Sequence, residues 1–184
     1  MIVLTLEAGP TSLEYHLWDM TGERDLASGL IVDLDRDAMH RYSYLYGSGR
    51  GTTPARSPAD ALARALESIA LSEPSIRRIE GLATDVEIVA HVFGVRPPGV
   101  GSATRVTDDL LAAIDGIAGV LPGQGRALRA SLEMATAARE ALPAGRHVAV
   151  FDDAFYQTRI PEGACTRSAR AAEAPLSGGS CAGG

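Results

Sequence analysis

The sequence contains little cysteine, no long apolar run and no leader-like N-terminus. Its two cysteines, Cys165 and Cys181, lie close to the C-terminus. A disulfide framework or a zinc site needs more ligands at closer spacing, so we expect free, reduced thiols. A membrane-spanning helix needs roughly 20 apolar residues, and a leader needs a basic region before an apolar core. The sequence offers neither feature, and we therefore expect a cytoplasmic protein that does not enter a membrane.

Positive charge is also in short supply. Lysine and arginine together number 17 against 23 aspartates and glutamates, which gives a formal net charge of −6 and a pI near 5.2. Proteins that bind nucleic acid neutralise its phosphates with basic side chains, so we expect no nucleic-acid partner. Hydrophobic residues make up 46% and charged residues 22% of the chain. These values are typical of globular proteins, and 184 residues suit one domain of ordinary size.

The order of apolar patterns predicts a mixed α/β fold. Alternating residues in the first third indicate three short strands joined by tight turns, which favours antiparallel hairpins. Residues 35–56 have no clear period and are expected to form a loop or short irregular elements. A helix should begin at Ser57, because serine caps helices well and Pro58 and Asp60 follow it in the first turn. The expected elements are strands at 2–7, 13–18, 26–34, 86–93 and 147–151, and helices that begin at Ser57, Thr107 and Arg126.

This β-β-β-α-β-α-α-β order implies a mixed sheet with helices packed against it. The composition changes near residue 162, after which alanine, glycine, serine and arginine dominate. Such a segment cannot bury enough apolar surface to offset its ordering entropy. We therefore expect one domain over residues 1–161 and a disordered tail over residues 162–184.

The first candidate site is the turn that contains Gly9, Thr11 and Ser12 between the first two strands. Backbone N–H groups and hydroxyls at such a turn can hold a phosphate group. An ordinary β-turn is the alternative, because glycine, proline, threonine and serine are common turn residues. Pro10 also removes one N–H donor that a phosphate site would use.

Two further candidates lie on buried strands. Asp152 directly follows the apolar run 147–151, and a carboxylate at such a strand end can hold Mg²⁺ or orient a nucleophile. The alternative is a helix N-cap or turn aspartate. His91 lies within the apolar stretch 86–93. Histidine is a frequent general acid or base, whereas a lone histidine among apolar residues is also compatible with a hydrogen-bonded core position.

Several segments resemble the acetokinase family in sequence, order and spacing. "EAGPTSLEY" at 7–15 is similar to the family's "NAGSSSLK[FY]" hairpin, and "IVAHVFGV" at 88–95 is similar to "VGHRVVHGG". "TRVTDDLLAAIDGIAGVLP" at 104–122 resembles the helix before the family's "PLHNP" motif. "VAVFDDAFYQT" at 148–158 resembles "VAVFDTAFHQT" and is the most specific match.

The resemblance implies an RNase H-like domain of the sugar kinase, Hsp70 and actin type. Acetate kinases have two such domains with the nucleotide between them, and the similar segments correspond to the N-terminal one. The second domain has no counterpart after about residue 161, which we interpret as a truncation or frameshift near residue 162. The implied reaction transfers phosphate from ATP to acetate, or to another short carboxylate, and gives ADP and acetyl phosphate with Mg²⁺ as cofactor.

The resemblance also assigns roles to individual residues. Asp152 and His91 are implied as catalytic residues, and Glu7 stands at the position of a metal-binding asparagine. The phosphate-binding residues implied by the hairpin are Gly9, Thr11 and Ser12.

Several positions depart from the family pattern, and its cationic side chains are largely lost. Glu14 replaces a lysine that pairs with the nucleotide phosphates, Val92 replaces a substrate-side arginine, and Tyr156 replaces a histidine. Phosphoryl transfer depends on positioning and charge neutralisation, so we expect weak or no activity of this chain alone. The alternative is a non-catalytic relic or interaction domain that binds a partner through its uncovered cleft face. A homodimer or a separate chain that carries the nucleotide domain are the partners we consider.

Overall fold

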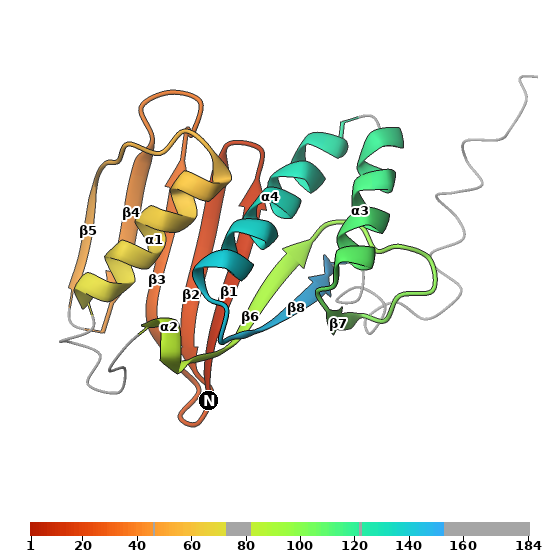
Figure 1. Cartoon of the computed structure of the whole chain (residues 1–184). Coiled ribbons are helices and arrows are strands. Elements are labelled where there is room, and N and C mark those ends of the chain that lie inside the picture. The colour runs from red at the N-terminus through yellow and green to blue at the C-terminus, as the bar shows by residue number, and fades with distance from the viewer. Residues whose placement is uncertain (46, 73–81, 122, 153–184) are drawn as a thin grey trace, which may run out of the picture.

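A computed structural model describes residues 1–45, 47–72, 82–121 and 123–152 (Figure 1). Its strands are β1 (Ile2–Gly9), β2 (Ser12–Asp19), β3 (Arg24–Val32), β4 (Met39–Tyr44), β5 (Gly47–Thr52), β6 (Val86–Phe93), β7 (Ala103–Arg105) and β8 (Arg146–Phe151). Its helices are α1 (Pro58–Ser72), α2 (Leu82–Asp85), α3 (Asp108–Val120) and α4 (Gly125–Ala141). The expected tail, the boundary at residue 161 and both cysteines lie outside the described residues.

All eight strands form one mixed sheet in the order β5-β4-β3-β2-β1-β6-β8-β7. Strands β1 to β5 form an antiparallel meander, β1, β6 and β8 run parallel to one another, and β7 pairs antiparallel with β8. The predicted mixed α/β architecture is therefore confirmed. Because the carboxyl ends of parallel strands meet at one edge, β1, β6 and β8 end close together.

The prediction of a loop over residues 35–56 is wrong, because this stretch contains the hairpin β4–β5. The hairpin lacks an apolar alternation because glycines occupy the inner positions of β5. A side-chain carbon added at Gly49 would lie 2.5 Å from the ring and hydroxyl of Tyr42, and one at Gly47 would lie 2.8 Å from the Tyr44 hydroxyl. The tyrosines of β4 therefore cover the space that side chains on β5 would fill. Strand β7 was also not predicted, since three residues are too few to show a period.

Helices α1, α3 and α4 cover one face of the sheet (Figure 1). Helix α4 separates two apolar clusters. Met134 and Ala138 pack in the first cluster with β1 and β2, whereas Leu128 and Ala135 pack in the second with Phe93. The two sides of α4 thus fix its position over β1 and β6, with Gly125 at its N-terminal end.

Capping contacts confirm two of the predicted helix starts. The Ser57 hydroxyl accepts a hydrogen bond from the Asp60 N–H at 3.1 Å, and the Asp60 carboxylate accepts one from the Arg56 N–H at 3.1 Å. The Thr107 hydroxyl accepts one from the Leu110 N–H at 3.2 Å. The Ser57 and Thr107 hydroxyls each satisfy an N–H group of the first turn that the helix itself leaves unpaired.

The opposite face of the sheet is less covered. Its side chains alternate with the core residues along each strand, and those of Val3, Thr5, Ile88, Ala90 and Val148 are only partly buried. The described residues place all three long helices on the other face. Within these same ranges, no helix is long and apolar enough to cross a membrane.

Candidate functional site

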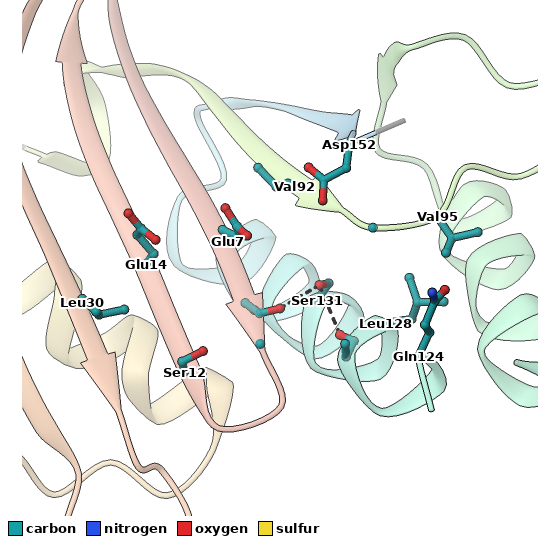
Figure 2. Close-up of a pocket in the computed structure, with 14 residues that line it drawn as sticks. Glu7, Ser12, Glu14, Leu30, Val92, Val95, Gln124, Leu128, Ser131 and Asp152 are labelled. Carbon is teal, nitrogen blue, oxygen red and sulfur yellow. Dashed lines mark hydrogen bonds between the residues drawn. The ribbon is translucent and has the colours of Figure 1, made fainter. Parts of the chain in front are cut away.

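A pocket of about 430 Å³ opens where β1, β6 and β8 end (Figure 2). The strands contribute Glu7 and Val92 to one wall, and α4 contributes Leu128 and Ser131 to the wall opposite. Ligands of open α/β sheets gather beyond the carboxyl ends of parallel strands, and this pocket occupies that place. The complete lining consists of Glu7, Ala8, Gly9, Ser12, Glu14, Leu30, Val92, Gly94, Val95, Gln124, Ala127, Leu128, Ser131 and Asp152.

Four of the six predicted site residues come together in this pocket. Glu7 and Gly9 lie at the end of β1, Ser12 begins β2, and Asp152 follows β8. These positions are up to 145 residues apart in the sequence, and the parallel pairing of β1, β6 and β8 joins them. The predicted role of each residue remains a prediction, but their proximity is a property of the fold.

The turn at the pocket edge is tight. Gly9 pairs with Ser12, so only two residues connect β1 to β2. A side-chain carbon added at Gly9 would lie 2.5 Å from the Ser12 hydroxyl oxygen, so glycine is what lets this hydroxyl lie against the backbone. Thr11 does not line the pocket; its carbonyl accepts a hydrogen bond from the Leu34 N–H at 3.2 Å. The turn therefore presents one hydroxyl, that of Ser12, rather than two.

The charge of the pocket is negative. Desolvation by burial raises the pKa of Glu7, and the neighbouring carboxylates of Asp152 and Glu14 raise it further. No lysine, arginine or histidine lines the pocket within the described residues. A site of this charge attracts a cation and repels a free phosphate or carboxylate.

Ser131 holds the helical wall in place. Its hydroxyl lies 3.1 Å from the carbonyl oxygen of Ala8 and 3.3 Å from that of Ala127, and it donates to them in a shared hydrogen bond. This hydrogen bond joins α4 to the C-terminal end of β1. The sequence alone does not indicate Ser131 or Gln124 as site residues, because neither a serine in the middle of an amphipathic helix nor a glutamine at its start is a signal of a site.

His91 lies outside the pocket, on the face of β6 that the helices cover. Its neighbour Val92 points to the pocket instead, since successive side chains of a strand alternate between faces. The His91 ring is 1% exposed and stacks on His147 with 5.3 Å between ring centroids. The His91 side chain therefore lies in the core of the protein, which is the alternative to a catalytic role that the sequence left open.

A chain of hydrogen bonds determines which ring nitrogens of this histidine pair carry a proton. His147 Nε2 lies 3.0 Å from the Leu142 carbonyl and must donate to it, which leaves His147 Nδ1 as an acceptor. His91 Nε2 then donates to that Nδ1 at 3.0 Å. Burial, followed by the nearby His147 and Arg139, lowers the pKa of His91 to about 3. Both rings are therefore neutral at physiological pH, and His91 Nδ1 has no hydrogen-bond partner among the described residues.

A magnesium ion fits the pocket only in part. Within the described residues, no group of three or more histidine, cysteine or acidic side chains is arranged to hold a metal. Mg²⁺ is often held by one or two carboxylates together with phosphate oxygens and water. Glu7 and Asp152 are close enough to interact electrostatically and meet that smaller requirement. The phosphates of ATP find no matching cationic side chain on this lining.

Comparisons with known proteins agree on one family. The family model described as the acetokinase family matches residues 2–170. The acetate kinase of Clavibacter michiganensis is 32% identical over 160 residues, which covers 85% of this chain and 38% of that protein. The acetate kinase of Streptomyces griseus is 33% identical over 171 residues and has the same 38% coverage. The chain thus spans well under half the length of these relatives.

Solved structures show the same fold. The Porphyromonas gingivalis acetate kinase superimposes with a TM-score of 0.71 at 23% identity, over 88% of this chain and 39% of that one. A propionate kinase from Francisella tularensis gives a TM-score of 0.68 at 16% identity. These similarities confirm the predicted RNase H-like fold class.

Proposed function

The chain belongs to the acetokinase family over residues 2–170, and from that membership we propose that it is a phosphotransferase domain of the acetate kinase type. The family resemblance predicted from its motifs is confirmed. The proposed reaction joins a carboxylate oxygen of acetate, or of another short carboxylate, to the terminal phosphorus of ATP. The bond between that phosphorus and the bridging oxygen breaks, and ADP leaves.

The observation that carries the proposal is the gathering of Glu7, Gly9, Ser12 and Asp152 around one pocket. In the proposed site, the Ser12 hydroxyl and the backbone N–H groups of the turn donate hydrogen bonds to phosphoryl oxygens. Asp152 orients the reacting groups at the end of β8. Glu7 and Asp152 would hold Mg²⁺, which supplies positive charge to the phosphoryl oxygens. The partly apolar wall of Val92, Val95 and Leu128 suits the methyl end of a short carboxylate.

His91 enters this proposal as a positioning residue. It bridges β6 and β8 through His147. Val92 follows His91 on β6, Asp152 follows the end of β8, and both line the pocket. The histidine pair therefore fixes the spacing of the two strands that present Val92 and Asp152, without reaching the ligand.

We further propose that a second polypeptide completes the nucleotide site. The lining contains Glu14 and Val92 but no cationic side chain within the described residues. An arginine that stabilises the transferring phosphoryl group contributes roughly 10³- to 10⁵-fold in rate. Without such a group, and with three carboxylates nearby, the domain alone should turn over very slowly.

Trapping acetyl phosphate with hydroxylamine tests the proposal. The purified chain is incubated with Mg-ATP and acetate, both alone and with the product of the adjacent gene. We expect background levels of hydroxamate from the chain alone and turnover in the mixture, which Asp152→Asn should abolish. Hydroxamate that stays at the background level both with the chain alone and with the mixture would contradict the phosphotransferase proposal.

The negative lining favours one second candidate, a non-catalytic domain that binds a partner instead of a nucleotide. Glu14 and Glu7 would repel ATP and leave the pocket without turnover. Calorimetric titration of Mg-ATP into the chain together with the second polypeptide separates the two candidates. Measurable binding by the complex supports the phosphotransferase, whereas a stable complex that gives a flat titration supports the interaction domain.

A further inference from the structure

We propose that a second hollow, which lies between α1 and β4, binds a flat, uncharged heteroaromatic ring that carries a hydrogen-bond acceptor. This α1–β4 hollow has a volume of about 260 Å³ and shares no lining residue with the pocket at the ends of β1, β6 and β8. Its walls include His40, Tyr42, Tyr44, Arg64, Glu67 and Leu71. This inference does not depend on the proposed reaction.

Two tyrosines form the strand wall of the α1–β4 hollow. Tyr42 and Tyr44 are paired with Gly49 and Gly47 of β5. The tips of their rings lie over these glycines, since a side-chain carbon added at either glycine would lie 2.8 Å or less from a tyrosine hydroxyl oxygen. The two rings are parallel to within 9°, with 6.4 Å between centroids, and both side chains are only partly buried. They therefore present adjacent aromatic surfaces on which a flat ring can stack.

The helix wall adds hydrogen-bond donors. Arg64, Glu67 and Leu71 are three and four residues apart on α1, which places them on one side of the helix. Nη1 of Arg64 donates to the Glu67 carboxylate at 2.6 Å, and this bond anchors the guanidinium while the side chain stays 39% exposed. The Arg64 Nε–H has no acceptor among the described residues. A carbonyl oxygen or ring nitrogen of a ligand, reached by a small turn of this side chain, would provide one.

The charge and the size of the α1–β4 hollow restrict the ligand. Arg64 and Glu67 pair with each other, and burial lowers the pKa of His40, so the His40 ring is neutral at physiological pH. The lining therefore favours neither an anion nor a cation. A volume of about 260 Å³ is slightly below the roughly 300 to 1,000 Å³ of typical ligand pockets and suits one ring system rather than a whole nucleotide. Nucleobases and other small heteroaromatic rings meet these requirements.

The strand wall is held in place before a ligand arrives. The Tyr15 hydroxyl and His40 Nε2 are hydrogen-bonded at 2.8 Å, and both side chains are buried. The His40 ring in turn lies against the Tyr42 ring, with 5.2 Å between centroids. A preformed aromatic wall reduces the entropy that is lost on binding.

An NMR titration of the ¹⁵N-labelled full chain with nicotinamide tests the proposal, because this molecule is flat, uncharged and carries an amide acceptor. We expect saturable shifts of the Gly47 and Gly49 amide signals. The expected Kd is in the millimolar range, which suits a ligand of about nine non-hydrogen atoms. Cyclohexanecarboxamide has the same amide but no aromatic face, so it should bind at least about fivefold more weakly.

Two variants separate the contributions of the two walls. Tyr42→Leu keeps an apolar cover over Gly49 but removes an aromatic face, and Arg64→Met keeps the apolar stem but removes the donors. Each should weaken nicotinamide binding at least about fivefold. Trp18→Leu makes the same kind of change on the opposite face of the sheet and is the matched control, which should leave binding unchanged.

Circular dichroism checks that each variant is folded, and Tyr44→Leu replaces Tyr42→Leu if that variant is not. The absence of saturable shifts would overturn the proposal, as would equal binding of the two amides. A Kd that either the tyrosine or the arginine variant leaves unchanged would also overturn it.

Discussion

At the scale of single residues, Glu14 adds a negative charge that opposes the binding of an anion in the pocket. It lines the pocket together with Glu7 and contributes to the raised pKa of that carboxyl. The backbone that presents these side chains keeps the two-residue turn of the hairpin. The site therefore retains its shape while its charge opposes an anionic ligand.

Replacing this one charge should recover anion binding. Glu14→Lys removes a repulsive carboxylate and adds an ammonium group beside Ser12. A swing of about 2 kcal/mol at contact distance in a solvated site predicts that inorganic phosphate or acetyl phosphate binds at least about tenfold more tightly. Isothermal titration calorimetry measures the change.

Glu140→Lys on the exposed end of α4 is the control for this substitution, because it makes the same change in net charge outside the pocket. Equal gains in affinity for the two variants would mean that the overall charge, rather than the pocket, governs anion binding.

At the scale of elements, the His91–His147 pair links β6 to β8 and makes their packing sensitive to acid. The folded chain keeps His91 neutral, with its pKa lowered to about 3, whereas the unfolded chain protonates it near its ordinary value of 6.5. Burial also lowers the pKa of His147. The stability that depends on neutral rings is therefore complete above about pH 6.5 and is lost as the pH falls towards 3.

Urea unfolding at about pH 7 and about pH 4.5 measures this effect. His91 alone should account for a loss of about 2 to 3 kcal/mol between these values, because only the unfolded chain gains the proton. His91→Leu should remove most of that pH dependence. Val89→Ala, on the same buried face of β6, should lower stability at both pH values and keep the dependence. An unchanged pH dependence in His91→Leu would contradict the account of this pair.

The junction of α3 and α4 offers a second test at this scale. A side-chain carbon at Gly125 would lie 2.2 Å from the Ala118 carbonyl oxygen, which belongs to the backbone and cannot rotate away. Gly125→Ala should therefore separate the two helices and destabilise the fold by about 1 to 3 kcal/mol.

Glycines within α3 provide the control. A side-chain carbon at Gly119 would meet nothing within 4 Å, so Gly119→Ala should stabilise the helix by roughly 0.5 to 1 kcal/mol. Thermal unfolding of both variants would show opposite signs, and a neutral Gly125→Ala would refute the close approach of the helices.

The strands and helices were predictable where the burial of one face gives the apolar residues a regular spacing in the sequence. Strands β1, β2 and β6 alternate between core and surface, and the helix starts at Ser57 and Thr107 carry capping residues. The hairpin β4–β5 was not predictable, because tyrosines of one strand cover glycines of the next and no apolar period results.

At the scale of the whole molecule, parallel pairing of β1, β6 and β8 makes a site from distant segments. The sequence predicted Glu7, Gly9, Ser12 and Asp152 as site residues, and the fold brings them to one pocket. The sequence did not predict that His91 would face the helices, because a short apolar run does not reveal on which face of the sheet each side chain lies. Nor did it predict the wall of α4, because Ser131 and Gln124 become pocket residues only through the packing of that helix on β1.

The central claim is that this pocket is the ligand site of an acetokinase-type domain. An NMR titration of the ¹⁵N-labelled full chain with acetyl phosphate and Mg²⁺ tests it most directly. The account predicts that the amide signals of Gly9, Ser12 and Val92 shift, that they shift more strongly in Glu14→Lys, and that those of Ser48 and Arg50 on β5 stay in place. Shifts confined to residues outside the pocket, or none in either protein, would contradict it.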